Sequence, residues 1–390
     1  MTQGPIVPVA GSSSNRGSPM SRTSADVTVI GGGVIGCAIA YALSRNGAQV
    51  TVIERSRIGA ESSSAAAGIL APRVHATAEH MFELALASHS LFPSLVEELR
   101  SESNLDSEYV RSGVLDLAHD DAAEQMLREK AQWLGQAGHD VRWLDPAHVH
   151  EMEPAVSLDI RGAFYDPDAY HINPSRFTQA LGQAAARRGV QFQIGVEALG
   201  LHCEGAHAAG VSTTAGDVAT SHVVLATGAW MARSGTWIDS PIPVFPAKGQ
   251  ILTVYAVPPP ISSVVFGLDA YLLPRVDGTV VVGATVEQVG FDRSLTVGGM
   301  SWLLNVVGEL CPALAGARFD RAWTGLRPGS PDELPIVGPA PGWDNVTLAT
   351  GHFRNGIMLA PITGELVAKL ILREELDPLL NPFSPSRFVI

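Results

Sequence analysis

Residues 26–54 carry the clearest hydrophobic pattern of this chain. An apolar run over 27–30 leads into a glycine-rich turn, a stretch with helical periodicity follows, and a second apolar run ends on Glu54. This order predicts a strand–helix–strand unit. Apolar spacing and cap residues predict further helices over 79–102, 120–137, 173–188, 300–310 and 357–372.

Strand patterns fill most of the other apolar stretches. A hairpin turn is predicted at Gly216 and Asp217, and residues 245–290 alternate as three strands joined by turns. That alternation predicts an antiparallel sheet. Shorter runs predict single strands over 113–117, 190–194, 222–228 and 346–351.

Length and charge narrow the class of protein. A chain of 390 residues exceeds one usual domain, so we expect two closely joined domains. The net charge of −13 argues against a nucleic-acid partner, because phosphates would repel such a surface. No uncharged apolar run reaches membrane-spanning length, so no membrane span is expected.

The three cysteines, Cys37, Cys203 and Cys311, form no CxxC pair, which favours a cytoplasmic location. Residues 1–24 are rich in Gly, Pro and Ser and lack the apolar core of a signal peptide, so a disordered tail is expected, and Met20 is an alternative start. The histidines lack carboxylate or cysteine neighbours at ligand spacing, so no metal site is expected.

A GxGxxG motif lies between the first strand and its helix. Gly31 permits the tight turn, Gly33 permits close approach of a pyrophosphate to the backbone, and Gly36 lets the helix pack on the strand. Glu54, at the end of the second strand, is placed to accept hydrogen bonds from ribose hydroxyls. The complete unit predicts an adenine dinucleotide site.

The distribution of ligand-facing segments favours FAD over a nicotinamide cofactor. Besides the N-terminal motif, a middle strand ending at Gly228 and a C-terminal loop over 352–356 are directed at the same ligand. The segment 55–70 is rich in small residues, which lets backbone lie against a flat ring. Nicotinamide dehydrogenases tend to keep the nucleotide domain contiguous.

Four segments resemble the D-amino-acid oxidase superfamily of FAD-dependent oxidoreductases, and within it the glycine oxidases of thiamine biosynthesis. The resemblance covers residues 25–375. The segments are SSAAAGIL (63–70), VVGAT (281–285), WTGLRPGSPDELPIVG (323–338) and ATGHFRNGIMLAPITGELVAKLI (349–371).

The resemblance implies an α/β fold, with a Rossmann-like FAD-binding domain of the glutathione-reductase type and an interleaved antiparallel-sheet substrate domain. The expected FAD-binding domain comprises 25–75, 155–244 and 321–375. The expected substrate domain comprises 76–154 and 245–320, and 376–390 forms a C-terminal tail.

The resemblance also implies non-covalent FAD, since WTGLRPG lacks the cysteine that covalent relatives carry there. Together with the glycine motif, it assigns FAD contacts to two groups of residues. The first is Gly31, Gly33, Val34, Ile35, Gly36, Glu54, Arg55, Ser62, Ser63, Ala67, Gly68 and Ile69; the second is Val196, Gly228, His352, Phe353, Arg354, Asn355, Gly356, Ile357 and Met358.

By the same resemblance, Arg327 binds the substrate carboxylate, Tyr271 assists it, and Arg354 lies nearby at the flavin. An arginine fork suits a carboxylate in a dry cavity, and we expect Arg327 in a turn between glycines and Pro328. From the residues alone, Tyr271 could be a half-buried packing residue and Arg354 a structural anchor. Asp269 and Val286 replace the usual His and Met, which leaves the preferred amino acid open.

The implied activity is oxidative deamination of glycine, sarcosine or small D-amino acids by O2 to a keto acid, ammonia or amine, and hydrogen peroxide, in the thiazole branch of thiamine synthesis. One alternative is a D-amino-acid or proline dehydrogenase that passes electrons to a quinone or a partner. Another is a flavin-binding scaffold without turnover. Thiazole synthase and further copies of the chain are the expected partners.

Overall fold

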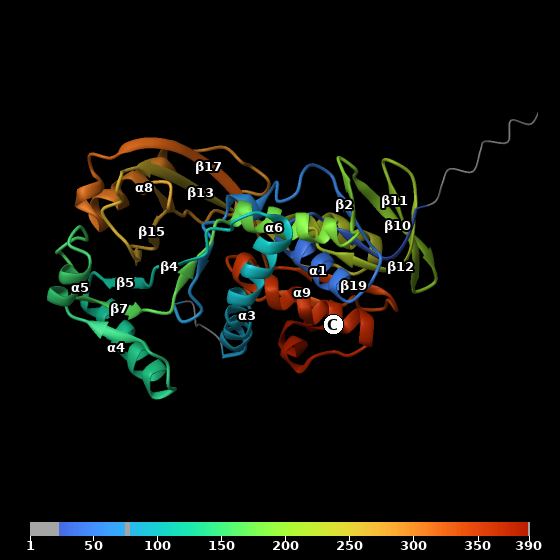
Figure 1. Cartoon of the computed structure of the whole chain (residues 1–390), viewed down its shortest axis with the longest axis horizontal. Helices are drawn as coiled ribbons and strands as arrows, with labels where there is room; N and C mark the ends of the chain where they lie inside the picture. Colours follow the sequence, from blue (N-terminus) through green and yellow to red (C-terminus); the bar gives the residue numbers. More distant parts are fainter. Residues whose placement is uncertain (1–22, 75–78, 389–390) are drawn as a thin grey trace, which may run out of the picture.

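The computed structural model describes residues 23–74 and 79–388. Its first sheet contains the parallel pairs β9–β2, β2–β1, β1–β12 and β12–β19, with β10–β11 and β18 added antiparallel. The strands are β1 (Thr23–Ile30), β2 (Val50–Glu54), β9 (Gln191–Ile194), β10 (Ala198–Glu204), β11 (His207–Thr213), β12 (Val218–Leu225), β18 (Ile336–Pro339) and β19 (Val346–Thr350). Figure 1 shows this sheet on the right.

Helices α1 (Val34–Arg45), α6 (Pro174–Arg187) and α9 (Gly356–Arg373) form the main core of this half. Small residues let α1 and α9 approach closely: a side chain at Gly364 would lie 2.7 Å from the carbonyl oxygen of Ala38. Asn173 caps α6 by accepting a hydrogen bond from the Arg176 amide at 3.2 Å, as its sequence predicted.

The second sheet, on the left of Figure 1, has the order β17-β13-β16-β15-β14-β5-β7-β6. Every pair is antiparallel except β14–β5. Its strands are β5 (Val114–Ala118), β6 (Arg142–Leu144), β7 (Gly162–Asp166), β13 (Phe245–Tyr255), β14 (Val264–Gly267), β15 (Ala270–Pro274), β16 (Thr279–Gly283) and β17 (Arg318–Gly329). The predicted α/β fold with a second sheet domain is confirmed.

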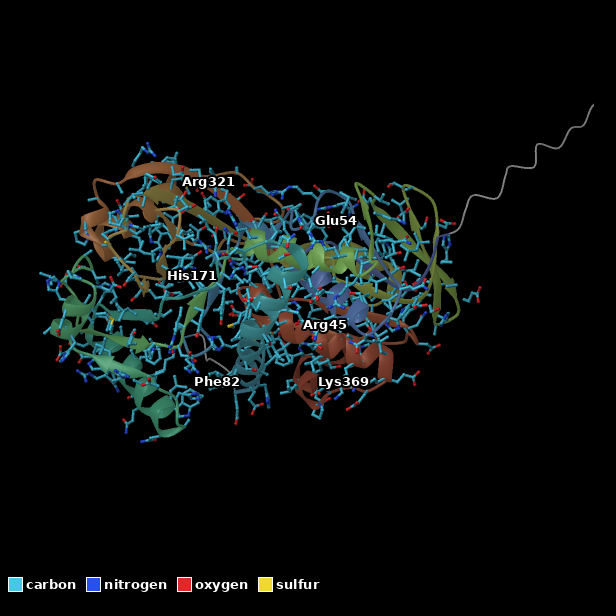
Figure 2. The ribbon with its side chains drawn as sticks, viewed as in Figure 1. Arg45, Glu54, Phe82, His171, Arg321 and Lys369 are labelled. Carbon is cyan, nitrogen blue, oxygen red and sulfur yellow. The ribbon has the colours of Figure 1, made fainter. Side chains whose placement is uncertain are left out.

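The other elements are short or connect the halves. They include α2 (Ser62–Ala65), α4 (Asp121–Gln136), α5 (Pro146–Met152), α8 (Val297–Leu310) and a small sheet of β3 (Ile69–Leu70), β8 (Tyr170–His171) and β4 (Val110–Arg111). Helix α3 (Glu79–Ser103) links the two cores. Phe92 packs on Phe177 of α6, whereas Phe82, labelled in Figure 2, packs 5.9 Å from Trp133 of α4.

At two places, the predicted domain assignment differs from the sheet to which the strands belong. β7 and the whole of β17 belong to the second sheet, although 155–244 and 321–375 were assigned to the FAD-binding domain. β17 extends because it pairs with β13 along its full length, from Arg318 to Gly329. The remaining domain limits stay a prediction.

The chain ends also differ from expectation. β1 already begins at Thr23, within the predicted tail over 1–24, because it pairs with β12; the rest of that tail lies outside the described residues. The C-terminal segment packs Leu380 and Phe383 into the main core.

No helix in the described ranges is both long and apolar enough to cross a membrane.

Candidate active site

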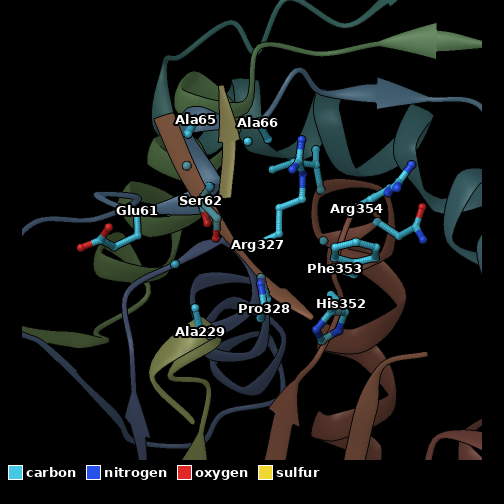
Figure 3. Close-up of a pocket in the computed structure, with 18 of the residues that line it drawn as sticks. Glu61, Ser62, Ala65, Ala66, Ala229, Arg327, Pro328, His352, Phe353 and Arg354 are labelled. Atoms are coloured by element: carbon cyan, nitrogen blue, oxygen red, sulfur yellow. The ribbon is translucent and has the colours of Figure 1, made fainter. Parts of the chain in front are cut away.

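A cavity of about 1440 Å³ lies where the two sheets meet. Drug-sized ligands occupy cavities of about 300–1,000 Å³, so this one has room for a larger ligand. Its wall includes the end of β1, the start of α1, the small-residue segment 61–69, the end of β12, the second sheet and the loop before α9. Figure 3 shows part of this lining.

The glycine motif adopts the geometry that its spacing predicts. Gly31 has φ +114°, in the region that favours glycine, and a side chain at Gly36 would overlap the Gly31 carbonyl oxygen. The amide of Val34, at the N-terminus of α1, donates to Ser63 Oγ at 2.9 Å. This positive helix end borders the cavity, so it suits a pyrophosphate.

Glu54 and Arg55 line the adjacent wall. Glu54 accepts hydrogen bonds from the amides of Gly32 at 2.7 Å and Ser56 at 2.8 Å, and a carboxylate still has acceptor sites for ribose hydroxyls. Arg55 stacks 4.1 Å from the ring of Trp230 and pairs with Glu61 at 3.2 Å. These contacts fit the adenosine part of FAD.

The small-residue segment is held close to the second sheet. The indole nitrogen of Trp323 donates to the Ala65 carbonyl at 3.1 Å, and a side chain at Gly325 would lie 2.6 Å from Ala65 Cβ. Arg275 donates to the Ala67 carbonyl, and burial lowers the pKa of Arg275 to about 10. Sequence reasoning missed Arg275, because its partners lie far away in the chain.

Ser63→Ala tests the expected cofactor contacts. The substitution removes the acceptor of the Val34 amide, and such a hydrogen bond contributes about 1 kcal/mol. We expect the FAD dissociation constant to rise about fivefold, measured by flavin fluorescence on release. Ser64→Ala is the matched control, because Ser64 Oγ donates to the Glu61 carbonyl. Equal flavin release from both variants would contradict the assignment.

Arg327 projects into the cavity from β17 (Figure 3). The predicted turn is wrong: 327 pairs with Ala247 in a regular strand, and Pro328 is tolerated because β17 is an edge strand. Its Nη1 donates to the Thr285 carbonyl at 3.1 Å, and no carboxylate of the described ranges pairs with it. Burial lowers the pKa of Arg327, so a carboxylate ligand would compensate an enclosed cation.

Tyr271 lies on β15 and lines the same cavity. Burial raises its pKa to about 12, while the charge of Arg327 acts in the opposite direction. Two glycines provide the space for both side chains. A side chain at Gly249 would lie 2.5 Å from Arg327 Nη1, and one at Gly283 would overlap the Tyr271 hydroxyl.

The loop before α9 closes the cavity. Arg354 is exposed at the rim of the cavity, and its guanidinium stacks 5.1 Å from the Phe353 ring. Figure 3 shows Arg354 near Arg327. His352 is buried and hydrogen-bonds Thr363 Oγ1 at 3.1 Å, and burial lowers its pKa to about 3. His352 is therefore neutral near pH 7 and has a structural partner.

The cavity brings together nearly every residue named from the sequence. Gly36 and Met358 are the exceptions: Gly36 faces β1, and Met358 packs in the main core. Asp269 and Val286 both line the cavity, as expected. The lining residues from the prediction are Gly31, Gly33, Val34, Ile35, Glu54, Arg55, Ser62, Ser63, Ala67, Gly68, Ile69, Val196, Gly228, Tyr271, Arg327, His352, Phe353, Arg354, Asn355, Gly356 and Ile357.

The described part of the chain contains no cluster of metal ligands, and its cysteines form no disulfide. No group of three His, Cys, Asp or Glu side chains is arranged to hold a metal ion in residues 23–74 and 79–388. Cys37 and Cys311 are buried and Cys203 is exposed, and all three are free. Burial raises the pKa of Cys37 to about 12, as is typical of a cysteine that packs as a small core residue.

Known proteins resemble this chain along most of its length. A bifunctional ThiO/ThiG protein of Trichormus variabilis is 38% identical over 93% of this chain but only 55% of its own length, so the chain spans about half of that relative. A glycine oxidase of Geobacillus kaustophilus is 35% identical over 93% of this chain and 97% of its own.

Solved structures agree with the sequence comparisons. The crystal structure of glycine oxidase from Geobacillus kaustophilus matches with a TM-score of 0.90 at 34% identity, covering 94% of this chain and 100% of that one. An L-proline dehydrogenase from P. horikoshii matches with a TM-score of 0.86 at 25% identity, covering 94% and 98%. The model of the FAD-dependent oxidoreductase (DAO) family matches residues 26–370, and the chain therefore belongs to this family.

Proposed function

We propose that this protein is an amino acid oxidase that deaminates glycine and other small amines, including sarcosine and small D-amino acids. The reaction consumes O2 and water and yields a keto acid, ammonia or an amine, and hydrogen peroxide. The observation that carries the proposal is the enclosed guanidinium of Arg327, which has no carboxylate partner in the described ranges and faces the cavity beside Tyr271.

Bound FAD supplies the two-electron oxidant for the substrate amine. The chain contributes orientation: the fork of Arg327 binds both carboxylate oxygens, which fixes the direction of the adjacent Cα–H bond. Tyr271 keeps its proton near pH 7, since its pKa is raised to about 12, and it can donate to the same carboxylate. The second sheet and the loop before α9 form part of the cavity wall and would displace water from a bound substrate.

A panel of amines tests the proposal. Glycine, sarcosine, D-alanine and D-proline are supplied to the purified, FAD-loaded protein, and oxygen uptake and peroxide are measured. We expect turnover of at least one of them with one peroxide per amine oxidised. Absence of turnover together with an unchanged flavin spectrum under anaerobic amine would contradict the proposal and favour a flavin-binding scaffold.

A dehydrogenase is the second candidate, and the similarity to an L-proline dehydrogenase supports considering it. Such a protein would pass electrons to a quinone or a partner subunit. It would bleach its flavin with an amino acid under anaerobic conditions, yet form little peroxide in air. The ratio of amine oxidised to peroxide formed separates the two candidates.

The names of the ThiO/ThiG relatives support a role in the thiazole branch of thiamine synthesis, with thiazole synthase as a partner. We further propose a homo-oligomer, a homotetramer by analogy with the family, in the cytoplasm. Size-exclusion chromatography with light scattering of the purified protein tests the assembly.

Tyr271→Phe measures the contribution of the tyrosine hydroxyl. Loss of a hydrogen bond to a charged group costs about 1.5 kcal/mol, so KM for glycine should rise about tenfold with kcat little changed. Because the pKa of Tyr271 is raised to about 12, the ratio of wild type to variant should stay constant between pH 7 and 10. Tyr255→Phe, on an exposed part of β13, is the control, and an equal KM in both variants would exclude the role.

A further inference from the structure

The cavity lining includes residues of β5 and α4 that the proposed reaction on glycine does not use. This part of the cavity, called the arm below, is lined by Asp116 of β5 and by Met126 and Leu127 of α4. Asp269 lies at the tip of the β14–β15 hairpin and lines the same cavity. Both central residues of that tip have positive φ, +53° at Leu268 and +59° at Asp269, as in a two-residue type I′ turn.

Strand register places Asp116 on the same face of the sheet as Tyr271. Tyr271 pairs with Phe266, and Phe266 pairs with Asp116. Since neighbouring strands lie about 4.8 Å apart, the Cα atoms of Tyr271 and Asp116 are separated by about 9.6 Å. The apolar ring of Phe266 lies between them, 5.8 Å from that of Tyr271.

Asp116 lacks a close partner. No hydrogen bond or ion pair within 4 Å holds its carboxylate in residues 23–74 and 79–388, and burial raises its pKa. Lys130 is the cation whose charge acts on it, but the ammonium group of Lys130 donates to the Val74 carbonyl. The charge of Asp166 also acts on Lys130, so the positive charge of this lysine interacts with two carboxylates.

The cations around this group are held by other carboxylates. Arg73 contacts Asp166 at 3.4 Å and Asp168 at 3.2 Å, and Arg111 pairs with Asp168 at 3.6 Å. In the described ranges, Asp116 is therefore left without a cation within ion-pair distance. A carboxylate that is removed from water without a partner is costly, so an arriving cation would be favoured at Asp116.

We infer that Asp116, assisted by Asp269, binds the distal cationic group of an amino acid with a basic side chain, whose carboxylate is held by Arg327. The inference rests on the proposed function and names a substrate class for it. Glycine is too short to span the arm, because its nitrogen and carboxylate carbon lie about 2.5 Å apart. The methylene groups of a longer substrate would contact Phe266 and the apolar residues of α4.

Ornithine and norvaline make the matched test, since they share the same carbon chain and differ in the distal amine. Both enantiomers of each are assayed by oxygen uptake, or by flavin bleaching if an acceptor other than oxygen is used, alongside glycine. Wild-type enzyme should have a higher kcat/KM for ornithine than for norvaline of the same hand. Asp116→Asn should lower this ratio about tenfold or more, and Asp269→Asn about threefold.

Asp159→Asn, at an exposed position that does not line the cavity, should change the ratio less than twofold. Flavin content of each variant reports correct folding. If the Asp116→Asn ratio equals that of wild type, or if wild type oxidises glycine but prefers norvaline to ornithine, the inference is wrong. If wild type oxidises no amine at all, the proposed function fails and this inference with it.

Discussion

Arg327→Ala is expected to lower kcat/KM for glycine by about 30- to 1000-fold while FAD is retained. The range corresponds to a loss of about 2–4 kcal/mol of transition-state stabilisation. The physical reason is that the substrate carboxylate would enter an enclosed cavity without its cation and without the two parallel donors that fix its orientation. Steady-state oxygen uptake over a range of glycine concentrations measures the effect.

Arg327→Lys separates charge from geometry. A lysine keeps the positive charge but offers no planar fork, so its kcat/KM should fall between those of wild type and the alanine variant. Flavin absorbance of each variant shows whether the cofactor is still bound. Unchanged kinetics of Arg327→Ala would remove this side chain from the mechanism.

Gly249→Ala is expected to lower kcat/KM about 10- to 100-fold, although the substitution replaces no charged residue. The new methyl group would lie 2.5 Å from Nη1 and 2.7 Å from Cζ of Arg327, so the guanidinium must move. Overpacking of this kind costs about 1–3 kcal/mol, here at the expense of carboxylate binding. The defect should appear mainly in KM, and FAD content should be unchanged.

Gly316→Ala is the matched control for this glycine substitution. A side chain at Gly316 would meet no atom within 4 Å, and its φ is not in the positive range. It should keep wild-type kinetics and a similar melting temperature. Normal kinetics of Gly249→Ala would show that the observed position of the Arg327 guanidinium is not required for turnover.

Some features of the molecule could be predicted because their signals are local. The helices near 79–102, 120–137 and 357–372 appear within a few residues of their predicted limits, since apolar periodicity and cap residues act within a few turns. The strand–turn–helix of the GxGxxG motif is equally local. Its glycines determine a turn, and a turn determines where the helix N-terminus points.

Other features were predicted incorrectly or missed because they depend on distant partners. The segment around Arg327 looks like a turn from its glycines and proline, but pairing with β13, some 80 residues earlier, makes it a strand. Gly249 and Gly283 carry no chemical signal in the sequence, yet they leave the space that Arg327 and Tyr271 occupy. Asp116 is one acid among many until strand pairing places it two strands from Tyr271.

The sequence by itself therefore determined the dinucleotide-binding unit, the presence of a second sheet and the residue types that a carboxylate-binding flavoenzyme needs. The tertiary structure alone decided where the guanidinium lies, which glycines make room for it and which carboxylate faces the unused arm of the cavity. The physical reason is that periodicity reports the burial of one face of a local element. Strand order, register and steric fit, by contrast, arise only when segments far apart in the chain pack together.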